Sequence, residues 1–168
     1  IAADGGEARR VGQLATGVSA LRWFPDSQSL ACVSWVWPEL TSQAAQAKKL
    51  KAEKDDKVKA TVVEHNHYRF WDHWFPRGRK PHIHVVDTRT GTFQDLFAGT
   101  AFHLSPQEPD AQIFDISPDG NELAFTFDYN PDPKDFSFTD IVAMDLKTRK
   151  TRRLTTRSEA LSRHAFEG

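Results

Sequence analysis

A chain of 168 residues is long enough for one domain of ordinary size with a hydrophobic core of its own. Its 22 basic and 23 acidic residues leave a formal net charge of −1, which gives no reason to expect a nucleic acid or an anionic membrane as partner. Twelve Phe and five Trp concentrate the apolar volume in large rings, so aromatic side chains should dominate the core.

The single cysteine and the first residues of the chain give only partial information on the cellular compartment of the protein. The single Cys32 excludes an internal disulfide and a cysteine-based zinc site, and it leaves both a cytoplasmic and a periplasmic location open. No stretch approaches the roughly 18 apolar residues that span a bilayer, and residues 1–10 lack the order of a signal peptide, so we expect a soluble chain. Because the sequence starts at Ile1 rather than Met, we expect it to be part of a longer protein.

Short segments of alternating apolar and polar residues, bounded by turn residues, make up most of the chain. This period of two is typical of half-buried strands. In chain order, the segments predict strands at 18–24, 28–36, 80–87, 92–97, 112–116, 122–128, 139–145 and 150–154.

Residues 39–59 depart from the strand pattern. They contain no Gly and no β-branched run, are rich in Ala, Lys, Leu and Glu, and follow Pro38, with Thr41 or Ser42 available as a cap. This composition predicts a helix. Between Lys48 and Lys59 it contains six lysines and three carboxylates, which indicates a solvated helix face and no nucleic-acid role.

Two motifs recur in the same order along the chain. Pro25-Asp26-Ser27 and Pro118-Asp119-Gly120 are each followed by Leu-Ala, and Val86-Asp87-Thr88 corresponds to Met144-Asp145-Leu146. The first pair is offset by 93 residues and the second by 58, so the first unit carries an insertion of 35 residues that contains the helix. Proline, aspartate and glycine at these positions favour tight turns between strands. Each unit is therefore expected to be a four-stranded meander.

Repeated four-stranded meanders predict the fold class and its division. Such meanders stack as the blades of a β-propeller, because one small sheet does not bury its own apolar face. The chain is predicted to be an all-β propeller fragment of about two four-stranded blades with a helical insertion at about 39–59 in the first. Residues 1–16 would end a preceding blade, 17–99 and 100–156 would form the two blades, and 157–168 would be a truncated next blade or a tail.

The repeated turns also carry a family resemblance. Ser117-Pro118-Asp119-Gly120 followed by Leu123-Ala124-Phe125 resembles the blade repeats of TolB-like and prolyl-oligopeptidase-type propellers. The Lys-rich helix, the aromatic run 68–74 and the segment 82–87 resemble early blades of bacterial acylaminoacyl-peptidase or dipeptidyl-peptidase-like enzymes.

This resemblance implies a non-catalytic propeller that gates peptide access to a C-terminal α/β-hydrolase domain of the parent serine peptidase. The nearest match here to a Gly-x-Ser-x-Gly nucleophile elbow is Gly17-Val18-Ser19-Ala20-Leu21, which lacks the second Gly. We therefore expect no catalytic residue in this chain, whereas the parent would be a serine hydrolase. The alternative is a TolB-like propeller that serves as a scaffold for protein binding.

An aromatic and charged cluster in the insertion is the candidate substrate-binding site. It comprises Tyr68, Arg69, Trp71 and Asp72, in a run that continues to Phe75. Large rings beside charged groups in a loop are typical of binding sites. Arg69 would meet a peptide carboxylate or pair with Asp72. The other interpretation is that these rings form a small core beneath the helix.

No cofactor or metal is expected. His65 with His67, and His82 with His84, each place two imidazoles on one face of a strand, but no carboxylate ligand accompanies them. We interpret these imidazoles as packing against the aromatic residues of the insertion. As partners we expect a peptide, the hydrolase domain of the parent, and a second copy of the chain through unpaired strand edges and bare apolar blade faces.

Overall fold

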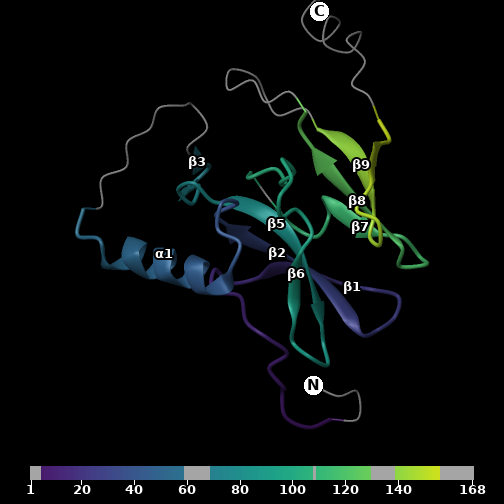
Figure 1. Cartoon of the computed structure of the whole chain (residues 1–168), viewed down its shortest axis with the longest axis horizontal. Helices are drawn as coiled ribbons and strands as arrows, with labels where there is room; N and C mark the ends of the chain where they lie inside the picture. The colour runs from purple at the N-terminus through teal and green to yellow at the C-terminus, as the bar shows by residue number, and fades with distance from the viewer. Residues whose placement is uncertain (1–4, 59–68, 108, 130–138, 156–168) are drawn as a thin grey trace, which may run out of the picture.

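The computed structural model describes residues 5–58, 69–107, 109–129 and 139–155. In this part of the chain it contains two four-stranded sheets, a two-stranded hairpin and one helix (Figure 1). The first sheet consists of β1 (Ser19–Trp23), β2 (Ser29–Val36), β5 (Lys80–Asp87) and β6 (Phe93–Asp95). The second consists of β7 (Phe114–Ile116), β8 (Glu122–Phe127), β9 (Asp140–Asp145) and β10 (Thr151–Arg153). The helix is α1 (Gln43–Asp55), and the hairpin pairs β3 (Arg69–Phe70) with β4 (His73–Trp74).

Both four-stranded sheets are antiparallel meanders. Their strand orders are β1-β2-β5-β6 and β7-β8-β9-β10, so neighbours in the sheet follow one another along the chain except where α1 and the hairpin intervene. Up-and-down sheets of four strands are the blade units of propellers. The chain is therefore an all-β propeller fragment with a helical insertion, and this prediction is confirmed. The eight predicted strands all form, each within about two residues of its expected bounds.

The first repeated turn has the same backbone hydrogen bond in both sheets. The carbonyl of Phe24 accepts from the N–H of Ser27 at 3.1 Å, and that of Ser117 accepts from Gly120 at 2.8 Å. Ser27 and Gly120 both adopt a left-handed conformation, with φ of 53° and 73°. The sequence repeat therefore corresponds to a repeated backbone geometry.

The second repeated turn also matches between the sheets. The carbonyls of Asp87 and Asp145 accept from the N–H groups of Gly91 and Arg149, both at 2.8 Å. Gly91 has φ of 72° and Arg149 has φ of 61°, so the second sheet places an arginine where the first uses a glycine. The carboxylates of both aspartates accept further backbone N–H groups within the turn, which lowers their pKa values.

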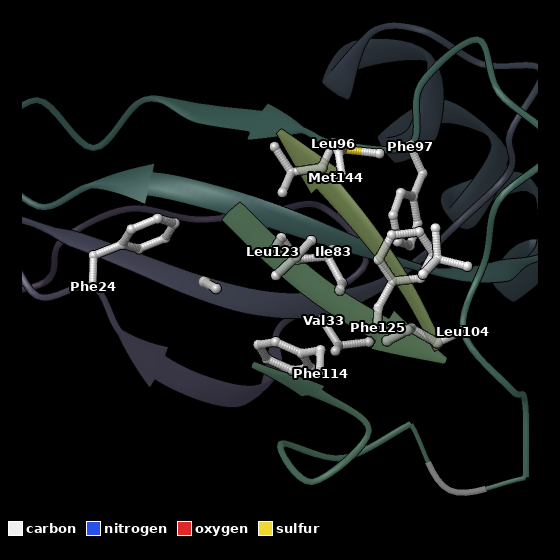
Figure 2. Packing of buried hydrophobic residues seen from close by; sticks show 12 residues of the cluster. Phe24, Val33, Ile83, Leu96, Phe97, Leu104, Phe114, Leu123, Phe125 and Met144 are labelled. Carbon is white, nitrogen blue, oxygen red and sulfur yellow. The ribbon is translucent and has the colours of Figure 1, made fainter. Parts of the chain in front are cut away.

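The hydrophobic core lies between the two sheets. Val33 and Ile83 of the first sheet face Leu123, Phe125 and Met144 of the second (Figure 2). The ring of Phe97, which follows β6, lies 4.7 Å from that of Phe125 between ring centroids. Full burial of each such side chain contributes about 1.5–3 kcal/mol to folding. The core is what holds the two blades together.

The opposite face of the first sheet is covered by the segment 9–17, which we call the N-terminal segment. One end lies against the β5–β6 turn, where Gly12 packs on the ring of Phe93. At the other end the hydroxyl of Ser34 donates to the carbonyl of Gly17 at 2.6 Å. Between these points Leu14 is buried. Cys32 lies on this face, and burial raises the pKa of its thiol to about 11.

Helix α1 is shorter than the predicted 39–59 and begins where Ser42 accepts a hydrogen bond from the N–H of Ala45. It lies beside the first sheet and away from the second (Figure 1). Gln46 anchors it, because its amide bonds both the N–H and the carbonyl of Trp37 at 3.1 and 2.9 Å. The indole of Trp37 in turn lies between Lys49 and the guanidinium of Arg79, at 5.0 and 4.9 Å from the ring centroid.

Among the described residues there is no helix that is long and apolar enough to cross a bilayer. The division at residues 16, 99 and 156 stays a prediction. The segment 157–168 lies outside the described residues.

Candidate functional site

An open groove lies between the β3–β4 hairpin, the first sheet and the loop before β7. Its volume is about 610 Å³. We call it the aromatic groove, because rings and prolines make up most of its lining: Ser19, Trp35, His73, Trp74, Phe75, Pro76, Pro106, Gln107, Pro109 and Asp110.

The rings of the aromatic groove differ in how much of their surface is exposed. Trp35, near the end of β2, stacks on Phe75 with centroids 6.4 Å apart and planes at 26°. This stack fixes the base of the groove. Trp74 on β4 is 60% exposed.

The hairpin displays a second exposed indole at its tip. β3 and β4 pair Arg69 with Trp74 and Phe70 with His73, which leaves a two-residue turn of Trp71 and Asp72. Trp71 has φ of 50° and is 79% exposed. A left-handed backbone costs a non-glycine residue about 1–3 kcal/mol and is concentrated at functional sites.

Asp72 and His73 are joined by a side-chain hydrogen bond on the hairpin. The carboxylate Oδ1 lies 2.7 Å from Nδ1 of the imidazole, and this hydrogen bond lowers the pKa of Asp72. Both side chains are largely exposed.

The predicted binding residues occupy this hairpin, except that Tyr68 lies outside the described residues. Arg69 is exposed on β3, Trp71 occupies the tip, and Asp72 follows it. Among the described residues, Asp72 forms its side-chain hydrogen bond with His73 and not with Arg69. Whether Arg69, Trp71 and Asp72 contact a ligand stays a prediction. Phe75 is packed against Trp35 of β2, whereas Trp71 and Trp74 are exposed, and the choice between the two interpretations of the cluster stays open.

None of the predicted residues Arg69, Trp71 and Asp72 lines the aromatic groove, although their neighbours His73, Trp74 and Phe75 do. Trp35, Pro106, Pro109 and Asp110 lie on other elements, and no local pattern relates them to the hairpin. The one feature of the sequence that could have indicated these residues is that Pro and Trp are frequent on both sides of the insertion.

Ser19 also lines the groove but lacks the setting of a nucleophile. It opens β1 and pairs with Val33 in the sheet, whereas a nucleophile elbow joins a strand to a helix. Among the described residues no hydrogen bond joins Ser19 to His73.

His82 and His84 lie on the buried face beneath the N-terminal segment, together with Asp95. Nδ1 of His82 is 2.9 Å and Nε2 of His84 is 3.8 Å from the same carboxylate oxygen, Oδ2 of Asp95. Burial alone would raise the pKa of Asp95, but the hydrogen bond with His82, the two imidazoles and the N–H of Phe97 together outweigh burial and lower it. Burial lowers the pKa of His84, whose Nδ1 is enclosed without a hydrogen-bond partner.

For His82 the predicted surroundings were wrong. The ring of His82 packs edge-on against Phe97 at 5.7 Å rather than against the aromatic residues of the insertion. The reason is the pleat of β5, which turns His82 and His84 to the face of the first sheet opposite the core. Within the described ranges no three His, Cys, Asp or Glu side chains are grouped as a metal would require. His65 and His67 lie outside those ranges.

No family model matches the chain, and no curated protein matches its sequence. Among solved structures, it is similar to the crystal structure of TolB from Acinetobacter baumannii, with 20% sequence identity and a TM-score of 0.45. The match covers 85% of this chain and 22% of that chain, so the chain spans about a fifth of that protein's length. The fold assignment rests on the two meanders and their repeated turns. Membership of the prolyl-oligopeptidase family stays a prediction from the sequence.

Proposed function

We propose that this chain is a protein-binding segment of a β-propeller, and that its aromatic groove holds an extended segment of the partner. The observation that supports this most directly is the exposed aromatic surface of the hairpin, where Trp74 is 60% and Trp71 is 79% exposed. Exposed tryptophans beside a groove are the residues that most often dominate the energy of binding between proteins.

The lining of the groove favours a peptide over a small polar metabolite. Pro76, Pro106 and Pro109 supply rigid apolar walls and no backbone N–H groups, so few donors converge on a small ligand. A peptide that lays apolar and aliphatic side chains across Trp35, Trp74 and Phe75 would bury surface without requiring many hydrogen bonds.

The test is selection of binding peptides from a random library displayed on phage, followed by titration with the purified chain. Trp74→Ala should weaken the selected peptides about tenfold or more, as loss of a central aromatic residue does. Trp23→Ala is the matched control, because Trp23 is 58% exposed and lies outside the groove lining. Equal loss in both variants, or no selected peptide, would contradict the proposal.

A second candidate function is the one implied by the family resemblance, a segment that gates peptides toward an α/β-hydrolase domain in a longer parent. It is supported by the repeated Pro-Asp turns and the helical insertion and by no residue of the groove. A fluorophosphonate probe applied to the full-length parent tests it. Labelling of the parent would support a serine hydrolase, and absence of labelling would favour the binding scaffold.

A further inference from the structure

We propose that the face of the first sheet beneath the N-terminal segment is a second peptide-binding site, which the segment occupies as an internal ligand. A partner peptide with the same pattern of side chains would replace the segment there. This site is separate from the aromatic groove, whose described lining includes no residue of the segment. The inference therefore goes beyond the proposed function and does not rest on it.

Alternate residues of the N-terminal segment face the sheet. Gly12 packs on the ring of Phe93, so closely that a Cβ added there would lie 2.6 Å from a ring carbon. Leu14 is 2% exposed. The hydroxyl of Thr16 lies 2.8 Å from that of Ser34. A period of two is that of an extended peptide lying on a surface, so the segment presents a small residue, an apolar residue and a hydroxyl to the sheet.

The residues between these contacts face away from the sheet. Gln13 and Ala15 line an open groove of about 600 Å³ that lies between the segment and α1. The N–H of Ala15 donates to the side-chain oxygen of Gln43, at the start of the helix, at 3.1 Å. The segment therefore packs on the sheet with one side and borders a hollow with the other, as a bound peptide does.

The sheet offers an apolar position for the leucine. Val86 pairs with Phe93 across β5 and β6, and Cys32 pairs with His84 across β2 and β5. Val86, Cys32 and His84 are each at most 3% exposed. Partners in neighbouring strands share one face of the sheet, so these side chains lie together beneath the segment. An apolar side chain of the ligand is the anchor that this face fits.

The segment is held in a way that allows exchange. Apart from Leu14, residues 9–17 are half-buried or exposed, and none of them belongs to a strand. A segment with one buried apolar side chain opens locally at a small free-energy cost. Its tether keeps it at an effective concentration on the order of millimolar, so a free peptide competes only when the internal anchor is weakened.

The experiment measures binding of a fluorescent peptide with the sequence of residues 9–17 to the whole chain by anisotropy. Leu14→Ala removes the internal anchor and leaves the sheet face unchanged. The peptide should bind this variant about tenfold or more tightly than the wild-type chain, because truncating a buried anchor has an effect of this size. Gln13→Ala, at the neighbouring residue that lines the groove, is the control and should bind the peptide as the wild type does.

Changes in the peptide test the pattern of side chains, with the Leu14→Ala chain as receptor. The Leu14→Ala peptide should bind about tenfold more weakly than the unchanged peptide. The Thr16→Val peptide should bind about two- to tenfold more weakly, the range for one neutral hydrogen bond. The Gln13→Ala peptide should bind equally well.

Cys32 reports where the peptide binds. It is the single cysteine of the chain and is fully buried on this face. A thiol reagent should modify it faster in Leu14→Ala than in the wild type, and an excess of unlabelled peptide should slow the reaction again. Trp74→Ala, in the aromatic groove, should leave binding of this peptide unchanged.

Two results would overturn the proposal. One is equal binding of the peptide to the wild type and to a Leu14→Ala chain that unfolds cooperatively in urea. The other is binding that leaves Cys32 as reactive as before. If Leu14→Ala does not unfold cooperatively, Thr16→Val in the chain replaces it, since this variant loosens the segment by one hydroxyl. The peptide should then bind about two- to tenfold more tightly than to the wild type, and equal binding would again overturn the proposal.

Discussion

His82 and Asp95 form a hydrogen bond of 2.9 Å on the face of the first sheet that the N-terminal segment covers. Asp95 also accepts the N–H of Phe97 at 2.8 Å through its other oxygen. A single carboxylate thus fixes a buried imidazole and the start of the segment that places Phe97 in the core.

Replacing Asp95 with alanine should destabilise the fold by about 1–3 kcal/mol, because the buried imidazole of His82 would lose its partner. The free energy of unfolding in urea measures this. Asp110→Asn, at an exposed carboxylate, should change it by less than about 0.5 kcal/mol. A similar decrease in the free energy of unfolding in both variants would show that the buried hydrogen bond contributes no more to stability than an exposed carboxylate.

The stability of the chain should fall as the pH drops below about 6.5. Burial lowers the pKa of His84 in the folded state from its usual 6.5, so the unfolded chain takes up a proton more readily and acid favours unfolding. His103 is half-buried, and burial also lowers its pKa, so it adds to the effect in the same direction. Urea midpoints between about pH 7.5 and 5 test this. The drop should be smaller in His84→Gln, and an equal drop would argue against His84 as a source.

Asp95 acts in a lower pH window. Its folded pKa lies below the usual 3.8, so it contributes stability above that value and loses the contribution as the pH falls through its folded pKa. The loss of stability between about pH 7.5 and 5 should therefore come from the imidazoles and not from this carboxylate.

Gly91→Ala should loosen the N-terminal segment. A Cβ there would meet the carbonyl oxygen of Val11 well inside normal contact, at a position whose φ is already 72°. Gly99→Ala is the control, because Gly99 has φ of 74° and nothing within 4 Å of an added Cβ. Cys32 lies beneath the segment, so its rate of modification by a thiol reagent should rise in the first variant and change little in the second. Equal rates would contradict a covering role for the segment.

Gln46→Ala should release α1 from the sheet. The side chain makes three hydrogen bonds, two to Trp37 and one of 2.9 Å to the carbonyl of Leu40. Loss of these buried bonds should cost about 2 kcal/mol or more and reduce the helical circular dichroism. Lys48→Ala, on the exposed side of the helix, should leave both unchanged.

We expect the chain to self-associate through β1. Leu21 is 60% exposed on β1, which is an edge strand without a partner on its outer side in the described part of the sheet. The outer face of the second sheet is less suited, because Glu122 and Arg152 form an ion pair across it. Leu21→Lys should shift the chain toward a monomer in light scattering. A wild-type chain that is monomeric at all concentrations would disprove this expectation.

The sequence by itself determined the strands, the helix and the repeat. Alternation of side chains along a strand and the demands of a tight turn are local properties, so Pro25-Asp26-Ser27 and Pro118-Asp119-Gly120 gave the same turn in both sheets. The same local rules did not indicate the short β3–β4 hairpin, whose tip places a tryptophan where glycine is usual.

Only the tertiary structure decided which of these residues meet. Trp35 and Pro106 line one groove although 71 residues separate them, and the partner of His82 is a carboxylate on the neighbouring strand. The sequence placed the histidines correctly on one face of a strand but did not indicate what covers that face. Strand pairing and the path of the N-terminal segment decide this, because contacts between distant residues depend on how the sheets pack and not on any local pattern.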